Sequence, residues 1–390
     1  MNPDWTVGRV VRDAVAAATP TVRRNAERLG SAYPDNTTTD GRYPPTPPAL
    51  GLTSGANHGW TTGFVPGMQW LCWDLTDDTF FRDVALAHAA DFRHRLAASQ
   101  DVDTHDLGFL YTLSCVAAWR YVGDDDARAT AVRAADQLLT RFLEPAGIIQ
   151  AWGRLADPAQ RGRTIIDSLM NMPLLTFAHR QTGEQRYADA VRRHTAALRE
   201  SIVRADGSTF HSFYWDPTTG AALRGDTEQG ARDDSCWARG QAWGIYGFAL
   251  NHRATGDPDL LAAARTCADY FLAHLPPDRV PYWDLVFGPG SDAPRDSSAS
   301  AIAVCGLLEL ADLVDEPDRA DAYRRSAEEL LISLVEHCTP APAEAADALL
   351  LHAVYDLPKR VGVDEGCLWG DYFYLEALAR LTDPGWRPPW

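Results

Sequence analysis

The chain has 390 residues, 46% hydrophobic and 23% charged, with a formal net charge of −17 at pH 7. This composition is typical of a globular protein with a large core. The negative charge argues against nucleic acid or an anionic membrane surface as a general partner. The N-terminal stretch MNPDWTVGRVVRDAVAAA lacks the apolar core of a signal peptide, and no segment is long and uncharged enough to span a bilayer.

The seven cysteines are scattered and form no Cys-x-x-Cys pair. This pattern predicts neither a zinc site nor a disulfide framework. We therefore expect a reduced, cytoplasmic protein.

Two kinds of predicted helix alternate along the chain. The first kind is apolar on nearly every face, so it must be buried all round; its members span 62–75, 107–122, 168–183, 237–256, 297–314 and 370–381. The second kind is amphipathic, with arginines and acids on one face; its members span 7–30, 80–97, 127–143, 185–203, 260–275 and 319–337. Pro20 is expected to kink or split the first amphipathic helix.

Short turns of Gly, Asp and Pro join each buried helix to the amphipathic helix that follows it. Six such pairs predict an all-α fold, an (α/α)6 barrel formed by residues 1–390 as a single domain, with an irregular α-solenoid as the competing layout. Long segments rich in Trp, Gly and Pro lead into the buried helices, so we expect the functional site at the N-terminal ends of those helices. They cover roughly 31–60, 98–105, 144–165, 204–236, 276–296 and 338–369.

Two aspartates stand where buried helices are predicted to begin, Asp106 in HDLGF and Asp167 in TIIDSLMNMPLL. Either one alone is most simply explained as a helix N-cap. Two carboxyl groups held close together at one mouth would instead push their pKa values apart, which yields the acid and the base that glycoside chemistry needs. Tryptophans in or next to the long segments suit the faces of sugar rings; they are Trp60, Trp152, Trp243 and Trp283.

Three further polar residues are candidates for the site: His105, His211 and Arg239. Arg239 lies just inside the start of a buried helix, where a positive charge is unfavourable because of the helix dipole. We therefore expect an anion or an acidic side chain to neutralise it. An anionic sugar would satisfy that requirement. No group of His, Asp or Glu has metal-ligand spacing, so we expect no metal.

Six stretches, HGWTTGF, HDLGF, TIIDSLMNMPLL, WARGQAWGIYGF, DSSASAIA and WGDYFYLEAL, together resemble the unsaturated glucuronyl hydrolases of glycoside hydrolase family 88. The resemblance covers roughly residues 55–381. It implies an (α/α)6-barrel catalytic domain that removes the 4,5-unsaturated uronic acid from the non-reducing end of oligosaccharides left by polysaccharide lyases. The implied partner is an unsaturated di- or oligosaccharide, without a cofactor, nucleic acid or membrane, and we expect a monomer or homodimer.

The same resemblance assigns residues. It implies that Asp106 and Asp167 are catalytic, and that the substrate contacts Trp60, His105, Trp152, His211, Gln229, Arg239 and Trp243. The implied chemistry is hydration of the C4=C5 double bond with Asp167 as acid and base, Asp106 raising its proton affinity, and His211 and Arg239 holding the uronate carboxylate. The serine and lysine positions with which some members recognise sulfate are not evident in LTDPGWRPPW.

Three alternatives stay open at this point. An unsaturated rhamnogalacturonyl hydrolase acting on pectin fragments would share the barrel and the chemistry, although the aspartate of HDLGF favours the glucuronyl type. An inverting endoglycanase would need an open cleft and a glutamic acid as the proton donor. A barrel that binds carbohydrate without catalysis would leave the paired aspartates unexplained.

Overall fold

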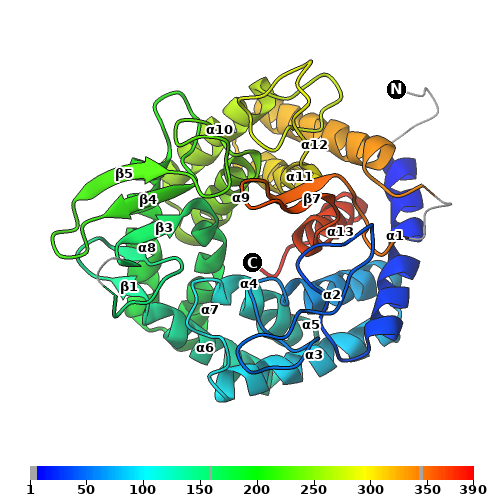
Figure 1. The fold of residues 1–390 in the computed structure, drawn as a ribbon, viewed down its shortest axis with the longest axis horizontal. Coiled ribbons are helices and arrows are strands. Elements are labelled where there is room, and N and C mark those ends of the chain that lie inside the picture. Colours follow the sequence, from blue (N-terminus) through cyan, green and yellow to red (C-terminus); the bar gives the residue numbers. More distant parts are fainter. Residues whose placement is uncertain (1–6, 158–159, 342–345) are drawn as a thin grey trace.

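In the computed structural model, which describes residues 7–157, 160–341 and 346–390, paired helices form a closed ring (Figure 1). The inner helices are α2 (Phe64–Thr76), α4 (Leu107–Tyr111) continued by the π-helical turn η1 (Thr112–Val116) and α5 (Ala117–Val122), α7 (Met172–Thr182), α9 (Ala238–Thr255), α11 (Ser297–Leu313) and α13 (Leu368–Thr382). The outer helices are α1 (Val7–Leu29), α3 (Thr79–Ala97), α6 (Asp125–Leu139), α8 (Gln185–Ile202), α10 (Pro258–Ala273) and α12 (Pro317–His337). With α4, η1 and α5 counted as one, these are twelve main helices within the described ranges.

The predicted (α/α)6 barrel is confirmed, and the solenoid is wrong because the ring closes. Helix α1 contacts α2, α12 and α13, and α13 contacts α2, so the last elements pack against the first. Burial follows the two sequence patterns. All residues of α11 from Ser297 to Ala311 are buried, whereas α8 buries one stripe that includes Tyr187, Val191 and Leu198.

Helix α1 runs unbroken through Pro20, so the expected split does not occur. Proline removes the hydrogen bond to the carbonyl four residues earlier. Pro20 and Ala16 both lie on the exposed side of the helix, where water can satisfy the carbonyl of Ala16.

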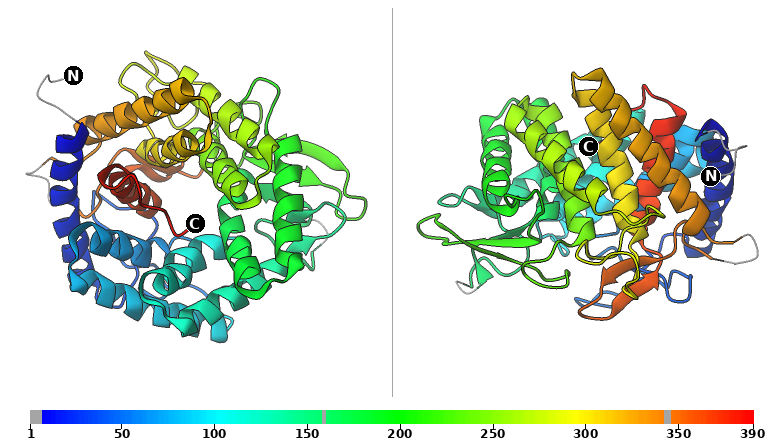
Figure 2. Two further views of the ribbon diagram at one scale, coloured as in Figure 1. Left: turned by 180° about the vertical axis from the view of Figure 1, so that it is seen from behind. Right: turned by 90° about the horizontal axis from the view of Figure 1, so that it is seen from above.

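The long segments carry short antiparallel strands that the sequence analysis did not predict. Strand β1 (Phe142–Leu143) pairs with β2 (Ile148–Ile149), β3 (Arg163–Ile165) with β4 (Ser212–Trp215), β4 with β5 (Ala222–Asp226), and β6 (Ala353–Asp356) with β7 (Val361–Glu365). The right-hand view of Figure 2 shows these strands gathered on one side of the helical ring. They lie at the end where the inner helices begin.

The inner helix predicted over 168–183 has an irregular start. Strand β3 leads into a 3-10 helix, η3 (Ile166–Asn171), and the α-helix begins only at Met172 with Pro173 in its first turn. Proline is tolerated in a first turn because its missing N–H has no intrahelical partner there. Asp167 therefore lies in the 3-10 turn between the strand and the α-helix.

Helix α4 and η3 approach each other closely at Gly108. A Cβ atom on Gly108 would lie 2.2 Å from the Cα of Asn171, so a side chain there would force the two segments apart. The Phe109 N–H donates to Asn171 Oδ1 at 3.0 Å across the same contact. This close packing brings together the segments that carry Asp106 and Asp167.

Candidate active site

A pocket of about 300 Å³ opens where the inner helices begin. Seven of the nine predicted site residues line it: Trp60, His105, Asp106, Trp152, Asp167, His211 and Gln229. They come from four of the long segments and from η3. The polar and aromatic residues that the sequence scattered over about 170 positions therefore meet in one place.

Asp106 occupies the N-cap position of α4 without capping it. Its carboxylate makes no hydrogen bond to the backbone of the first turn. Instead it accepts a hydrogen bond from the Thr104 hydroxyl at 2.9 Å and lies 3.3 Å from Nε2 of His105. The carboxylate is thus available to the pocket, and the simple cap explanation is wrong for Asp106.

Asp167 has a carboxyl group suited to carrying a proton. Burial raises its pKa well above the ordinary value of 3.8, and the charge of Asp106 raises it further. Backbone N–H groups of its own turn and the charge of Arg239 oppose these effects. Oδ1 of Asp167 is buried and has no hydrogen-bond partner within the described chain. An orphaned buried oxygen facing a pocket is a position for a proton or a ligand group.

His211 presents a fixed donor to the same pocket. Its Nδ1 accepts hydrogen bonds from the backbone N–H groups of Glu228 and Gln229, at 3.1 and 3.3 Å. In the neutral ring the proton is then on Nε2, which is buried and has no partner among the described residues. Burial lowers the pKa of His211 to about 3, so the ring stays neutral. The backbone carbonyl of His211 also accepts from the Ile166 N–H at 3.0 Å, which fixes the histidine beside Asp167.

Trp152 and His105 form one wall. The Trp152 ring centroid lies 6.3 Å from that of His105 and 6.2 Å from that of His211. The guanidinium of Arg163 lies 4.8 Å from the Trp152 centroid and supports the ring by a cation–π contact. Burial lowers the pKa of His105, although Asp106 acts in the opposite direction. A partly exposed aromatic ring beside two imidazoles is suited to one face of a sugar.

Further lining residues come from β6 and the turn after it, and no sequence motif predicts them. Trp60 Nε1–H donates to the Tyr355 hydroxyl at 3.0 Å, and Gln229 Nε2–H donates to the Tyr355 carbonyl at 2.8 Å. At the rim, Lys359 Nζ pairs with Asp356 Oδ2 at 2.8 Å. A lysine therefore lines the pocket from this turn, whereas residues 381–390 contain none. Tyr355–Lys359 carry no motif of their own, so only the pairing of β6 with β7 reveals them.

Arg239 and Trp243 lie behind the pocket wall. The Arg239 guanidinium forms an ion pair with the buried carboxylate of Asp296 at 3.2 Å and donates hydrogen bonds to the carbonyls of Val354 and Tyr355. It also stacks over the rings of Trp237 and Trp369. The partner expected for Arg239 was an anion or an acid, and the structure supplies the acid. The contact with a sugar carboxylate that was expected for Arg239 stays a prediction.

The tryptophans divide between the pocket and the core. The Trp243 ring packs against Phe109 and Phe373, and Trp283 is buried against Phe287. Neither lines the pocket. The direct sugar contact predicted for Trp243 therefore has no support in the pocket's geometry, and Trp283 is a core residue.

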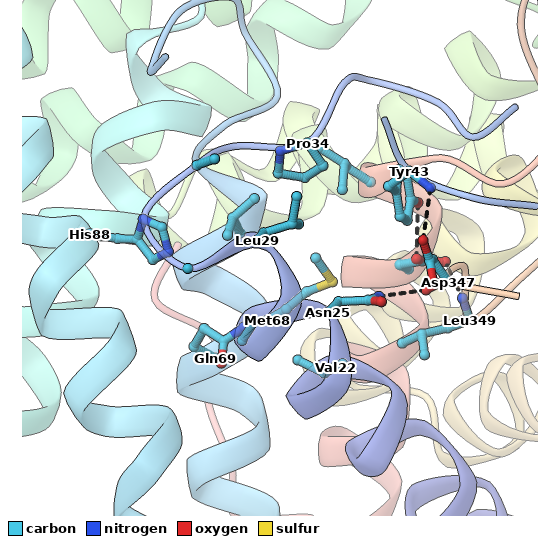
Figure 3. A pocket seen from close by; sticks show the side chains of 16 residues that line it. Val22, Asn25, Leu29, Pro34, Tyr43, Met68, Gln69, His88, Asp347 and Leu349 are labelled. Carbon is cyan, nitrogen blue, oxygen red and sulfur yellow. Dashed lines mark hydrogen bonds between the residues drawn. The ribbon is translucent and has the colours of Figure 1, made fainter. Parts of the chain in front are cut away.

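A second, smaller cavity carries none of the predicted site residues. It measures about 30 Å³, lies between α1, α2, α3 and α13, and is largely apolar (Figure 3). Asn25 Nδ2–H donates to the Asp347 carbonyl at 2.7 Å, and the Tyr43 N–H donates to Asp347 Oδ2 at 3.1 Å. A space this small accommodates water and excludes a sugar.

Two features of the described residues bear on other classes of protein. No described helix is long and apolar enough to cross a membrane. Within the same described ranges, no three His, Cys, Asp or Glu side chains are grouped so that they could hold a metal ion.

An (α/α)6 barrel with two carboxyl groups and flat aromatic rings in one pocket is typical of a glycoside hydrolase. Comparison with known proteins makes the class specific. The model of Glycosyl Hydrolase Family 88 matches residues 39–341, and the chain belongs to this family. The resemblance inferred from the six sequence stretches is confirmed.

Individual relatives agree with the family. The chain is 44% identical over 326 residues to the unsaturated chondroitin disaccharide hydrolase of Streptococcus pneumoniae, covering 83% of this chain and 82% of the relative. It is 41% identical over 371 residues to the unsaturated glucuronyl hydrolase of a Bacillus species, covering 95% and 96%. The crystal structure of unsaturated glucuronyl hydrolase from Streptococcus agalactiae superimposes with a TM-score of 0.93 at 40% identity, covering 100% of this chain and 96% of that one.

Proposed function

We propose that this chain is an unsaturated glucuronyl hydrolase in which residues 1–390 form one catalytic domain. It removes the 4,5-unsaturated uronic acid from the non-reducing end of an oligosaccharide. The relatives named above support this activity, and none of the comparisons supports the rhamnogalacturonyl alternative. The observation that carries the mechanism is the state of the Asp167 carboxyl group. This group is buried, its Oδ1 has no hydrogen-bond partner among the described residues, and its pKa is raised. The same pocket holds the neutral donor His211.

The substrate contains a vinyl ether, C4=C5–O5, conjugated with a carboxylate. Asp167, protonated at the start, delivers its proton to C4, and positive charge develops at C5 where the ring oxygen shares it. Asp106 stabilises that charge and keeps the proton on Asp167 until the substrate takes it. Here a single group acts first as general acid and afterwards as general base.

Water completes the addition. As its oxygen bonds to C5, the Asp167 carboxylate accepts one of its protons, so that water has added across the double bond and Asp167 has regained its starting state. The C5 hemiketal opens to a ketone, which frees the oxygen on C1. The resulting hemiacetal expels the remaining sugar as an alcohol. No atom of the protein becomes bonded to the sugar in this sequence.

Binding groups surround the reacting carbons. The His211 Nε2–H donates to the uronate carboxylate, since it is a buried donor of the pocket that has no partner among the described residues. Trp152 stacks on the unsaturated ring, and Trp60 and Gln229, both held by Tyr355, contact the next sugar. Lys359 and Asp356 at the rim meet substituents of that sugar.

The parent polysaccharide proposed is a glycosaminoglycan of the chondroitin type. Relatives named unsaturated chondroitin disaccharide hydrolase are 40–44% identical to this chain, whereas an unsaturated glucuronyl hydrolase specific for heparin is 29% identical. A mutant of the Streptococcus agalactiae enzyme has been crystallised with dGlcA-GalNAc6S. The seven cysteines are all buried and unpaired, which supports a reducing, cytoplasmic compartment.

Hydration is tested by running the reaction in D2O. Unsaturated chondroitin disaccharide should lose its enoate ultraviolet absorbance, and the uronate product should carry deuterium at C4. A saturated glucuronide, p-nitrophenyl β-glucuronide, should be left uncleaved, because it has no double bond to protonate. Cleavage of the saturated compound at a comparable rate would show ordinary attack at the anomeric carbon.

A further inference from the structure

A larger cavity lies at the opposite end of the barrel from the aspartates. It measures about 510 Å³ and is formed where the inner helices α5, α7 and α9 end, together with the C-terminal segment 387–390. Four arginines line it, Arg120, Arg180, Arg253 and Arg387. No aspartate or glutamate side chain is among its described lining residues. This is a concentration of positive charge in a protein whose formal net charge is −17.

The four arginines differ in how they are neutralised. Arg253 pairs with the buried carboxylate of Glu309, and Arg387 lies 3.6 Å from Asp312. Arg120 donates to the backbone carbonyl of Pro388 and makes no ion pair with any carboxylate of the described residues. Arg180 makes neither a hydrogen bond nor an ion pair within the described chain. Both side chains are exposed to solvent, and they line the cavity without an opposing charge from the described residues.

These two unpaired groups act on each other. Burial lowers the pKa of Arg120, and the charge of Arg180 lowers it further. Arg120 and Arg180 lie in the last turns of α5 and α7, where a positive charge complements the helix dipole. This explains the position of each arginine when it is considered alone. It does not account for two guanidinium groups that converge on one cavity without an acid between them. An anion in the cavity would remove the repulsion.

The remaining lining residues are mostly apolar, with Thr176 and Gln181 as the polar ones. Trp119, Phe177 and Leu250 line one side, and Pro388, Pro389 and Trp390 line the other. The Trp390 ring is fixed in place because it stacks on Phe373 at 11° and donates from Nε1 to Glu376 at 2.8 Å. A volume of this size is ordinary for a site that binds a small organic molecule and large for a single inorganic ion.

We propose that this cavity is a second ligand site, separate from the catalytic pocket, for a small organic molecule bearing two or more carboxylate or phosphate groups. Arg120 and Arg180 bind its oxyanions, for which planar guanidinium groups offer paired donors. Its carbon skeleton lies against Trp119 and Phe177. The site is independent of the proposed reaction, because none of these residues lines the catalytic pocket.

The test uses the full-length protein and two probes, citrate for polycarboxylates and fructose 1,6-bisphosphate for organic phosphates. Isothermal titration calorimetry and thermal shift are measured for the wild type, Arg180→Gln and Arg120→Gln/Arg180→Gln. Arg192→Gln is the matched control, since among the described residues its exposed side chain pairs only with Asp189 on the outer helix α8. Arg180→Gln removes no described bond, so its fold should be intact.

We expect one probe, or both, to bind the wild type and the control equally, and to bind Arg180→Gln about tenfold or more weakly, as expected for a lost charge-assisted contact. The probe that binds identifies carboxylate or phosphate as the natural group. Absence of binding by both probes at 10 mM would overturn the proposal. Equal binding by wild type and both cavity variants would also overturn it, and competition with unsaturated disaccharide in that case would locate the probe in the catalytic pocket.

Discussion

Replacing Asp167 with Asn separates chemistry from structure at the centre of the site. Asn keeps the size of the side chain and can accept the hydrogen bonds of the 3-10 turn, but it cannot deliver a proton to C4 of the substrate. General acid–base catalysis is typically worth about 10²–10⁴-fold, so kcat should fall by that factor. KM should change little, because the donor of His211 and the ring of Trp152 are untouched.

The assay follows the loss of enoate absorbance of an unsaturated chondroitin disaccharide, with circular dichroism to verify the fold. Asp257→Asn is the matched control, because Asp257 is a true N-cap whose carboxylate accepts the Asp259 N–H at 2.9 Å. Asn caps about as well as Asp, so this variant should be silent. If Asp167→Asn keeps wild-type kcat, or raises KM alone, Asp167 is not the acid and the mechanism proposed here is refuted.

Four further outcomes are expected. Asp106→Asn should lose less kcat than Asp167→Asn and move the basic limb of the pH–rate profile to lower pH, and the double variant should be hardly worse than Asp167→Asn. His211→Ala should lower kcat/KM by about tenfold to a hundredfold, the worth of a charge-assisted hydrogen bond, equally at every pH from 5 to 8 since burial holds the pKa of His211 at about 3. Arg239→Ala should lower the free energy of unfolding by about 3–5 kcal/mol, because it leaves Asp296 buried and unpaired, and calorimetry showing an unchanged Tm would contradict this. The pKa of Asp167 is raised in the folded protein, so its contribution to stability is lost as pH rises above about 4. Asn does not titrate, so the Tm of Asp167→Asn minus the Tm of the wild type should increase with pH. A Tm difference that stays constant with pH would contradict this prediction.

The helices of this fold could be predicted because each has a complete pattern of its own. An inner helix is apolar all round and an outer helix has one apolar stripe, and both patterns are local. The strands β3 to β5 could not be predicted in the same way, since Arg163–Ile165 pairs with a segment about 50 residues later. The pairing depends on where the barrel places its loops, and no local signal records it.

The site was predictable where residue type and position both pointed to chemistry. Asp106 and Asp167 stand at predicted helix starts, and the barrel brings those starts to one mouth. Arg239 had an equally suggestive position, but its partner Asp296 lies 57 residues later on the next inner helix, so the ion pair was invisible in the sequence. Tyr355 and Lys359 reach the pocket on a hairpin whose residues resemble an ordinary turn.

The position of Arg239 is compatible with the role that the proposed mechanism gives to Asp167. The substrate is an anion, and an arginine in the pocket would bind it strongly. The charge of Arg239 already lowers the pKa of Asp167 from behind the pocket wall. An arginine inside the pocket would lower that pKa further and favour the deprotonated carboxylate, which cannot donate a proton to C4. The pocket offers two neutral donors, His211 held by two backbone N–H groups and Gln229 held by a carbonyl, and the lysine that lines it, Lys359, is paired with Asp356. Arg239 is kept behind the wall, where Asp296 partly cancels its charge. An arginine in the pocket would therefore oppose the raised pKa of Asp167 on which the proposed mechanism depends.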